Sequence, residues 1–196
     1  MARLLKLNPA STGVFVLCWP DQTCAPELTV WLTLYVGIPV NNIRWMRGSE
    51  EKPVSKNEWI ERALSSEYDD FLFAERDIRP NPHTTGPLLD AHENADIACT
   101  HYPVKRAGAW EGPHPFHTGL WRANRDTLEH IGIPAFFPVL SAGGSRITGC
   151  SCGYFAARAA RLGVRFAVAG SSHHAVARAP DDGLPDCYRI PNPARP

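Results

Sequence analysis

Glu75 and Asp77 are the residues whose type and spacing point most directly to chemistry. They follow the apolar run 71–74, which predicts a buried strand. In an extended segment, residues two apart point to the same side, so the two carboxylates would repel each other unless a cation joined them. Hard divalent ions such as Mg²⁺ or Mn²⁺ prefer oxygen ligands and leave positions open for water and phosphates. The pair therefore predicts a metal-bridged diphosphate site; the alternative is two solvated carboxylates at a strand end.

The elements that would position this pair alternate between strands and helices. Apolar runs bounded by Gly or Pro predict strands, and apolar residues at helical spacing predict helices. This order predicts a parallel sheet with right-handed crossovers, in which ligands bind at the carboxyl ends of the strands. The predicted strands are 13–19, 41–48, 71–74, 95–102 and 164–170, and the predicted helices are 26–36, 55–66, 123–132 and 152–162.

Composition favours one domain over residues 1–178, followed by an irregular, proline-rich tail over 179–196. Lys plus Arg and Asp plus Glu number 20 each, so no net charge draws the protein to nucleic acid or anionic lipid. No apolar run approaches the ~20 residues of a membrane span, and the apolar stretch near the first residue is too short for a signal peptide. We therefore expect a cytoplasmic protein whose six cysteines are reduced.

The segment "RALSSEYDDFLFAERDIRPNP" resembles the part of GT-A-fold glycosyltransferases in which a helix leads into a hydrophobic strand ending in the DXD motif. Lys56 and Asn57 are similar to an Arg/Lys-Asn helix start in family two-like members. The segments "HTGLWRANRDTLEHIG" and "CGYFAARAARLGVRFAVAG" resemble later parts of the same family in the same order. The resemblance covers about residues 13–175 at low identity.

The resemblance implies an α/β fold with a mostly parallel open sheet and transfer of a sugar from a nucleoside-diphosphate sugar. The acceptor is unknown (a protein, glycan or nucleic acid), and the cofactor is Mn²⁺ or Mg²⁺. The implied metal ligands are Glu75, Asp77 and one of His173 and His174. The implied donor-binding residues are Trp19, Asp21, Lys56, Asn57, Arg76 and Gly119, and the catalytic candidates are Cys152, Ser151 and His117.

One departure from the family pattern concerns the mechanism. Inverting members carry an Asp a few residues before the helix equivalent to "YFAARAARLG", whereas this sequence has Ser151 and Cys152 there. An unshifted thiol is mostly protonated near neutral pH and is a poor general base. The alternatives are a retaining reaction, a base from elsewhere, donor binding without turnover, or a Cys152 thiolate activated by the start of the helix.

Other function classes have weaker support. No G-x-x-x-x-G-K-[ST] occurs and no G-x-G-x-x-G follows the first strand, which argues against a P-loop NTPase and a dinucleotide-binding oxidoreductase. Cys150 and Cys152 with His173 and His174 have the residue types of a zinc site, but the C-x-C spacing is tighter than usual. The rival interpretations are a non-catalytic sugar-nucleotide or glycan-binding module and a zinc-stabilised interaction protein.

Overall fold

The computed structural model describes residues 3–19, 25–49, 51–101, 116–140, 147–149 and 151–174. Within these residues, seven strands form one sheet in the order β2-β1-β3-β6-β5-β9-β4, and β7 and β8 form a separate two-stranded sheet. The strands are β1 Thr12–Cys18, β2 Ile43–Arg47, β3 Asp70–Glu75, β4 Ile78–Pro80, β5 Ile97–His101, β6 Leu120–Asn124, β7 Val139–Leu140, β8 Ile147–Gly149 and β9 Phe166–His174. The helices are α1 Pro26–Val30, α2 Lys52–Leu64, α3 Pro82–Leu89, α4 Arg125–Ile131 and α5 Ser151–Arg161, with short 3₁₀ or π turns at Pro9–Ser11, Trp31–Tyr35 and Val40–Asn42.

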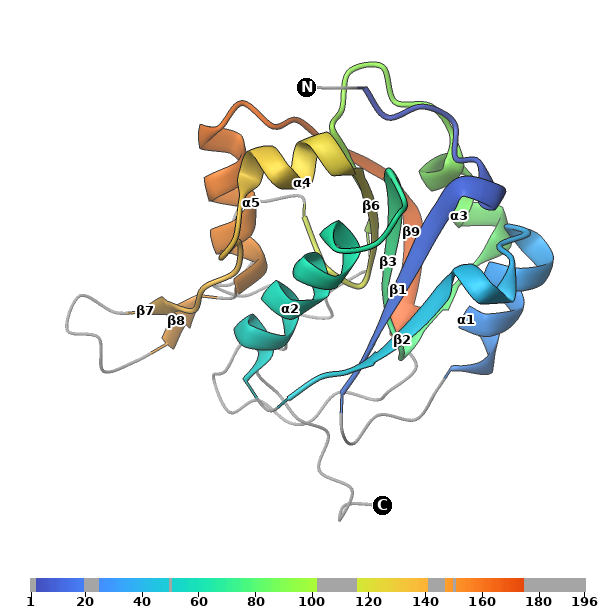
Figure 1. Cartoon of the computed structure of the whole chain (residues 1–196), viewed down its shortest axis with the longest axis horizontal. Coiled ribbons are helices and arrows are strands. Elements are labelled where there is room, and N and C mark those ends of the chain that lie inside the picture. Colours follow the sequence, from blue (N-terminus) through green and yellow to red (C-terminus); the bar gives the residue numbers. More distant parts are fainter. Residues whose placement is uncertain are drawn as a thin grey trace, which may run out of the picture.

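Helices cover both faces of the sheet, with α2, α4 and α5 on one side and α1 and α3 on the other (Figure 1). Alternate residues of β3 enter different cores: Phe71 and Phe73 pack with Trp59 of α2, whereas Leu72 and Ala74 pack on the opposite face. A strand buried on both faces has no polar alternation, which explains its continuous apolar run. Glu75 continues the series of Phe71 and Phe73 and therefore points toward the α2 and α5 side.

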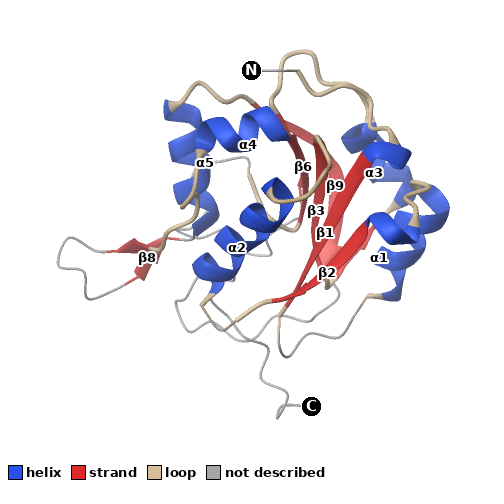
Figure 2. Ribbon diagram, in the orientation of Figure 1, coloured by secondary structure: helices blue, strands red, loops and turns tan. Residues whose placement is uncertain are grey.

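The predicted α/β class with flanking helices is confirmed, but the expectation of a mostly parallel open sheet is wrong. β1 runs parallel to β2 and β3, whereas β6 is antiparallel to both β3 and β5, and β4 is antiparallel to β9. The sheet is thus mixed and curls into a half-barrel (Figure 2). The sequence concealed β6 because it runs directly into α4, whose first residues follow Asn124 without a loop.

The curl follows from chain connectivity. Only Arg76 and Asp77 separate β3 from β4, yet three strands lie between them in the sheet. A flat sheet would place these strands about 19 Å apart, more than the roughly 11 Å that the short link can span. β9 makes the short link possible because it bends at Gly170, which has a φ of 84°. Near that glycine the pairing of β9 passes from β5 to β4. The end of β9 therefore lies beside the segment that follows the acidic pair.

Helix α2 begins at Lys52, three residues before the predicted start. Its buried stripe runs through Lys52, Lys56, Trp59, Ile60 and Ala63, so two lysines lie on the face that packs against the sheet. Burying an ammonium without a partner is costly, so these positions need nearby acceptors or carboxylates.

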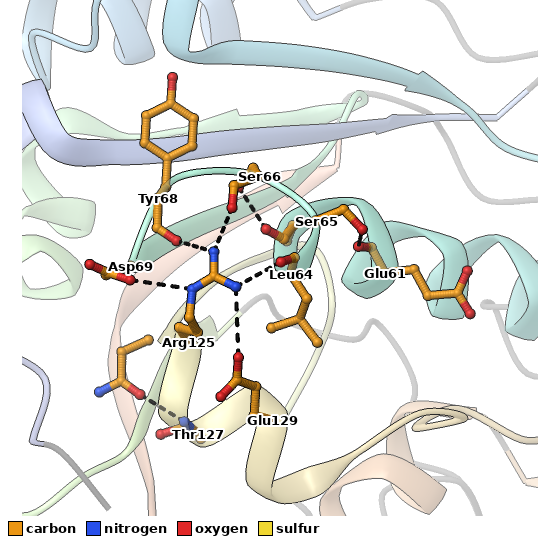
Figure 3. Close-up of polar contacts among 11 residues, drawn as sticks. Glu61, Leu64, Ser65, Ser66, Tyr68, Asp69, Arg125, Thr127 and Glu129 are labelled. Atoms are coloured by element: carbon orange, nitrogen blue, oxygen red, sulfur yellow. Dashed lines mark hydrogen bonds and ion pairs between the residues drawn. The ribbon is translucent and has the colours of Figure 1, made fainter.

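Arg125, the first residue of α4, fixes the C-terminal end of α2 (Figure 3). Its guanidinium donates to the main-chain carbonyls of Leu64, Ser66 and Tyr68 at 2.7, 2.7 and 2.6 Å, and pairs with the carboxylate of Asp69 at 3.3 Å. The last carbonyls of a helix have no partner within the helix, and Arg125 satisfies that of Leu64 together with two carbonyls of the segment that follows α2. No helix in the described part of the chain is long and apolar enough to cross a membrane.

Candidate functional site

The acidic pair lies at the carboxyl end of β3, where the sequence places it. The N–H of Glu75 donates to the carbonyl of Gly119 at 2.8 Å, and the N–H of Arg76 donates to that of Leu17 at 2.9 Å. Glu75 and Asp77 are both buried. The assumption of an extended segment is wrong beyond Glu75, because Arg76 and Asp77 form a turn into β4. The chain thus buries two carboxylates at one strand end, connected by a turn.

The carboxylate of Glu75 is held by two neighbours from different elements. Thr118 donates its hydroxyl proton to Oε1 of Glu75 at 2.6 Å, and Nζ of Lys56 lies 3.8 Å from the same oxygen. Lys56 is only 1% exposed and reaches this point from α2. A charge-assisted hydrogen bond and an ion pair together offset the cost of burying the carboxylate and the ammonium.

Cys152, a catalytic candidate, lies against this ion pair. Lys56 donates to its sulfur at 3.4 Å, and Oγ1 of Thr118 lies 3.5 Å from the same atom. Ser151 is fully buried, and its hydroxyl has no hydrogen-bond partner among the residues that the structure describes. The two residues at the position of the expected general base are therefore both inside the core.

A second thiol lies close to this group. Burial raises the pKa of Cys99 to about 12, although hydrogen bonding from the backbone of His117 partly opposes this increase. Cys99 is thus a neutral thiol near pH 7. His117, the third catalytic candidate, is half-buried and enters this group through its main chain.

Asn57, a predicted donor-binding residue, holds a loop in place. Its side-chain carbonyl accepts the N–H groups of Ala135 and Phe136 at 2.8 and 2.9 Å, and its amide donates to the carbonyl of Phe136 at 3.0 Å. The ring of Phe136 then lies 5.8 Å from Nζ of Lys56 and stacks on Phe155 of α5. Asn57 therefore supports the loop that carries Phe136 to Lys56.

The other predicted donor-binding residues occupy different positions. Trp19 is buried after β1, with Nζ of Lys52 5.3 Å from its ring centre, so it belongs to the core. Gly119 is buried and contributes its carbonyl to Glu75, whereas Arg76 is half-buried in the turn between the two carboxylates. Asp21 lies outside the described residues.

The histidines are placed through their main chain. His174 pairs with Ile78 and His173 with Arg79, so the end of β9 lies beside the residue that follows Asp77. The side chains of both histidines, and the whole of Cys150, lie outside the part of the chain that the structure describes. Among the side chains that are described, no group of three or more His, Cys, Asp or Glu is arranged to hold a metal ion.

The sequence analysis missed two residues: Thr118, which contacts Glu75, and Lys52, which lies over the ring of Trp19. Thr118 stands between His117 and Gly119, which were both predicted site residues. Its hydrogen bond to Glu75 could not be predicted, because it depends on how the segment before β6 packs against β3. Lys52 could have been found, because it lies four residues before Lys56 on the same helical stripe. An earlier predicted start of the helix would have marked it.

Comparisons with known proteins support the fold alone. No protein-family model matches the chain, and no curated protein matches its sequence. Among solved structures, the "Crystal Structure of A197 from STIV" resembles this chain with a TM-score of 0.54 and 15% sequence identity. The match covers 82% of this chain and 83% of that chain.

Proposed function

We propose that this protein is a metal-dependent glycosyltransferase that uses a nucleoside-diphosphate sugar and has a GT-A-like architecture. The observation that carries the proposal is the burial of Glu75 and Asp77 at the carboxyl end of β3, beside the parallel strand β1. Ligands of open α/β sheets bind at such strand ends. The resemblance of the surrounding sequence to the DXD segment supplies the substrate class, and the acceptor is left open.

The carboxylate oxygens at this strand end are of the ligand type that Mn²⁺ and Mg²⁺ prefer. Glu75 and Asp77 provide carboxylate oxygens, and such ions are commonly bound by one or two carboxylates together with water and substrate phosphates. A third protein ligand is therefore not required, although His173 or His174 is a candidate from its place in β9. When bound, the ion would neutralise the negative charge that develops on the departing diphosphate.

The chain's own residues would perform the remaining tasks. Lys56 and Thr118 hold the carboxylate of Glu75 in one orientation, which reduces the reorganisation needed when a donor binds. Arg76, half-buried in the turn between the two carboxylates, would supply the guanidinium that meets a phosphate. Of the alternatives for the mechanism, we expect a retaining outcome, because the leaving diphosphate can accept the proton of the acceptor.

A second candidate function is a sugar-nucleotide or glycan-binding module without turnover. One specific observation favours it: Ser151 and Cys152, which stand where inverting family members keep an Asp, are 0% and 2% exposed. A group buried to this extent cannot take a proton from an acceptor unless the site opens. This candidate shares the donor site with the first and differs only in catalysis.

Thermal shift with a panel of nucleoside diphosphates, with and without Mn²⁺, tests the donor site. We expect a Mn²⁺-dependent rise in melting temperature for the wild type that is abolished in Asp77→Asn and preserved in Glu93→Gln, an exposed carboxylate used as the matched control. Donor hydrolysis or transfer then separates the enzyme from the binding module. Mn²⁺-dependent binding that survives in Asp77→Asn would contradict the proposed site.

A further inference from the structure

Four buried side chains, one of which is Glu75 of the acidic pair, form a closed ring of polar contacts. Glu75 lies 2.6 Å from Thr118 and 3.8 Å from Lys56. Cys152 closes the ring, 3.5 Å from Thr118 and 3.4 Å from Lys56. The members come from β3, from the segment before β6, from α2 and from α5. Each member is less than a tenth exposed. The ring thus connects the candidate metal ligand to the start of α5.

The hydrogen bonds around the ring have a defined direction. A threonine hydroxyl carries one proton, and Thr118 donates it to Glu75 at a distance typical of a charged acceptor. At the Thr118–Cys152 contact the thiol must therefore donate to the hydroxyl oxygen. Lys56, whose ammonium can only donate, donates a hydrogen bond to the sulfur of Cys152. Cys152 thus acts as a neutral thiol that donates to one ring member and accepts from another.

We propose that Cys152 is a positioning residue, which acts through Lys56 and Thr118 to orient the carboxylate of Glu75. Without the sulfur, Thr118 loses the donor to its oxygen and Lys56 loses an acceptor. Both side chains are then less constrained in the low-dielectric core, where such contacts are strong. This inference rests on the proposed function only in taking Glu75 as a metal ligand. It gives the break in the family pattern a structural role and removes Cys152 from the catalytic candidates.

A metal-free double-mutant cycle tests the ring itself. The unfolding free energies of wild type, Cys152→Ala, Glu75→Gln and the double variant are measured by chemical denaturation. We expect the two substitutions to be non-additive, because each disturbs partners that the other also needs. Cys99→Ala serves as the matched control, since it removes a neighbouring buried thiol outside the ring. We expect Cys99→Ala to be additive with Glu75→Gln, and additivity of Cys152→Ala with Glu75→Gln would overturn the proposal.

Mn²⁺ titration in the presence of inorganic diphosphate, followed by electron paramagnetic resonance of free Mn²⁺, tests the consequence for Glu75. Loss of a residue that orients a metal ligand typically weakens metal affinity about 10–100-fold. We expect a loss of about tenfold for Cys152→Ala. Cys152→Ser should restore most of the affinity because a hydroxyl also donates and accepts, and Cys99→Ala should leave it unchanged.

The outcomes separate the two proposals. A wild type that fails to bind Mn²⁺ with diphosphate contradicts the proposed function, while the cycle still decides the ring. A wild type that binds, with an affinity that Cys152→Ala leaves unchanged, contradicts the positioning role and leaves the proposed function standing. Equal losses in Cys152→Ser and Cys152→Ala would also overturn it, because the hydroxyl would then not replace the thiol in the ring.

Discussion

Among single side chains, Lys56 and Glu75 form the contact with the largest electrostatic consequence. The two groups are nearly inaccessible to solvent and lie 3.8 Å apart. Removing one partner of a buried pair leaves an uncompensated charge in a medium that solvates it poorly. The pair therefore supports the fold and prepares the candidate site at the same time.

Glu75→Gln is expected to lower the free energy of unfolding by about 3–5 kcal/mol, because it leaves the ammonium of Lys56 without its carboxylate. Chemical denaturation measures this loss. Glu67→Gln, an exposed carboxylate close to the same strand, is the control and should change little. A stability of Glu75→Gln within experimental error of the wild type would contradict the importance of the pair.

Asp96 makes a second prediction at this scale. Burial raises the pKa of Asp96, but the hydrogen bonds and charge of Arg165 outweigh burial and lower it overall. A lowered pKa means that the ionised carboxylate stabilises the folded state above the unfolded pKa of ~3.9. That contribution is lost as pH falls through the lower folded value. We expect Asp96→Asn to flatten stability below about pH 4 relative to wild type in acid titrations, with Glu93→Gln as the control.

At the level of elements, α2 is the helix on which the site depends, because it carries Lys56 and Asn57. Arg125 of α4 fixes the C-terminal end of α2 by donating to the carbonyl of Leu64 and to two carbonyls of the segment that follows. Asn57 connects the middle of α2 to the loop before β7. Two contacts far apart in the sequence thus fix the position of Lys56 relative to β3.

Arg125→Ala is expected to destabilise the protein by about 2–3 kcal/mol, because several buried or half-buried carbonyls lose a donor. The loss should concentrate at the end of α2, so the amides of Ser65 and Ser66 should exchange faster in native-state hydrogen exchange. Arg62→Ala, an exposed arginine of α2, is the matched control. Unchanged exchange at these serines in Arg125→Ala would refute the clamp.

For the whole molecule, the decisive feature is the curl that brings the end of β9 to β4. It depends on the positive φ of Gly170 and on the two-residue link between β3 and β4. A buried hydrogen bond between the hydroxyls of Thr100 and Ser172 at 2.8 Å joins β5 to β9 beyond that glycine. This arrangement places the main chain of His173 and His174 beside the residues that follow the acidic pair.

Gly170→Ala should lower stability by about 1–2 kcal/mol, since a side chain at positive φ is strained. It should also reduce hydrogen-exchange protection of the β4 amides, because among the described residues β4 pairs with positions 172–174 of β9, beyond Gly170. Gly37→Ala is the control: Gly37 has φ 81 but lies outside the sheet. We expect a similar strain there with no change in β4. Equal protection of β4 in both variants would contradict the role of the bend.

Local patterns were sufficient for much of the first half of the chain. Continuous apolar runs predicted β1 and β3, helical spacing predicted α2, and the acidic pair was expected at the carboxyl end of β3, where it lies. These features depend on neighbours within a few residues, so periodicity alone reports them. The α/β class follows from the same alternation of strands and helices.

Tertiary structure alone decided the rest. The antiparallel β6, the curl at Gly170 and the partners of Glu75 depend on residues up to about a hundred positions apart, such as Lys56 and Cys152. Such contacts arise only when separate elements pack, and no local pattern encodes which side chains then meet. Trp19, Asn57 and Cys152 were chosen for their types and positions in the sequence. Their surroundings place Trp19 in the core, Asn57 against the loop before β7 and Cys152 in a buried polar ring, because packing determines what each side chain can reach.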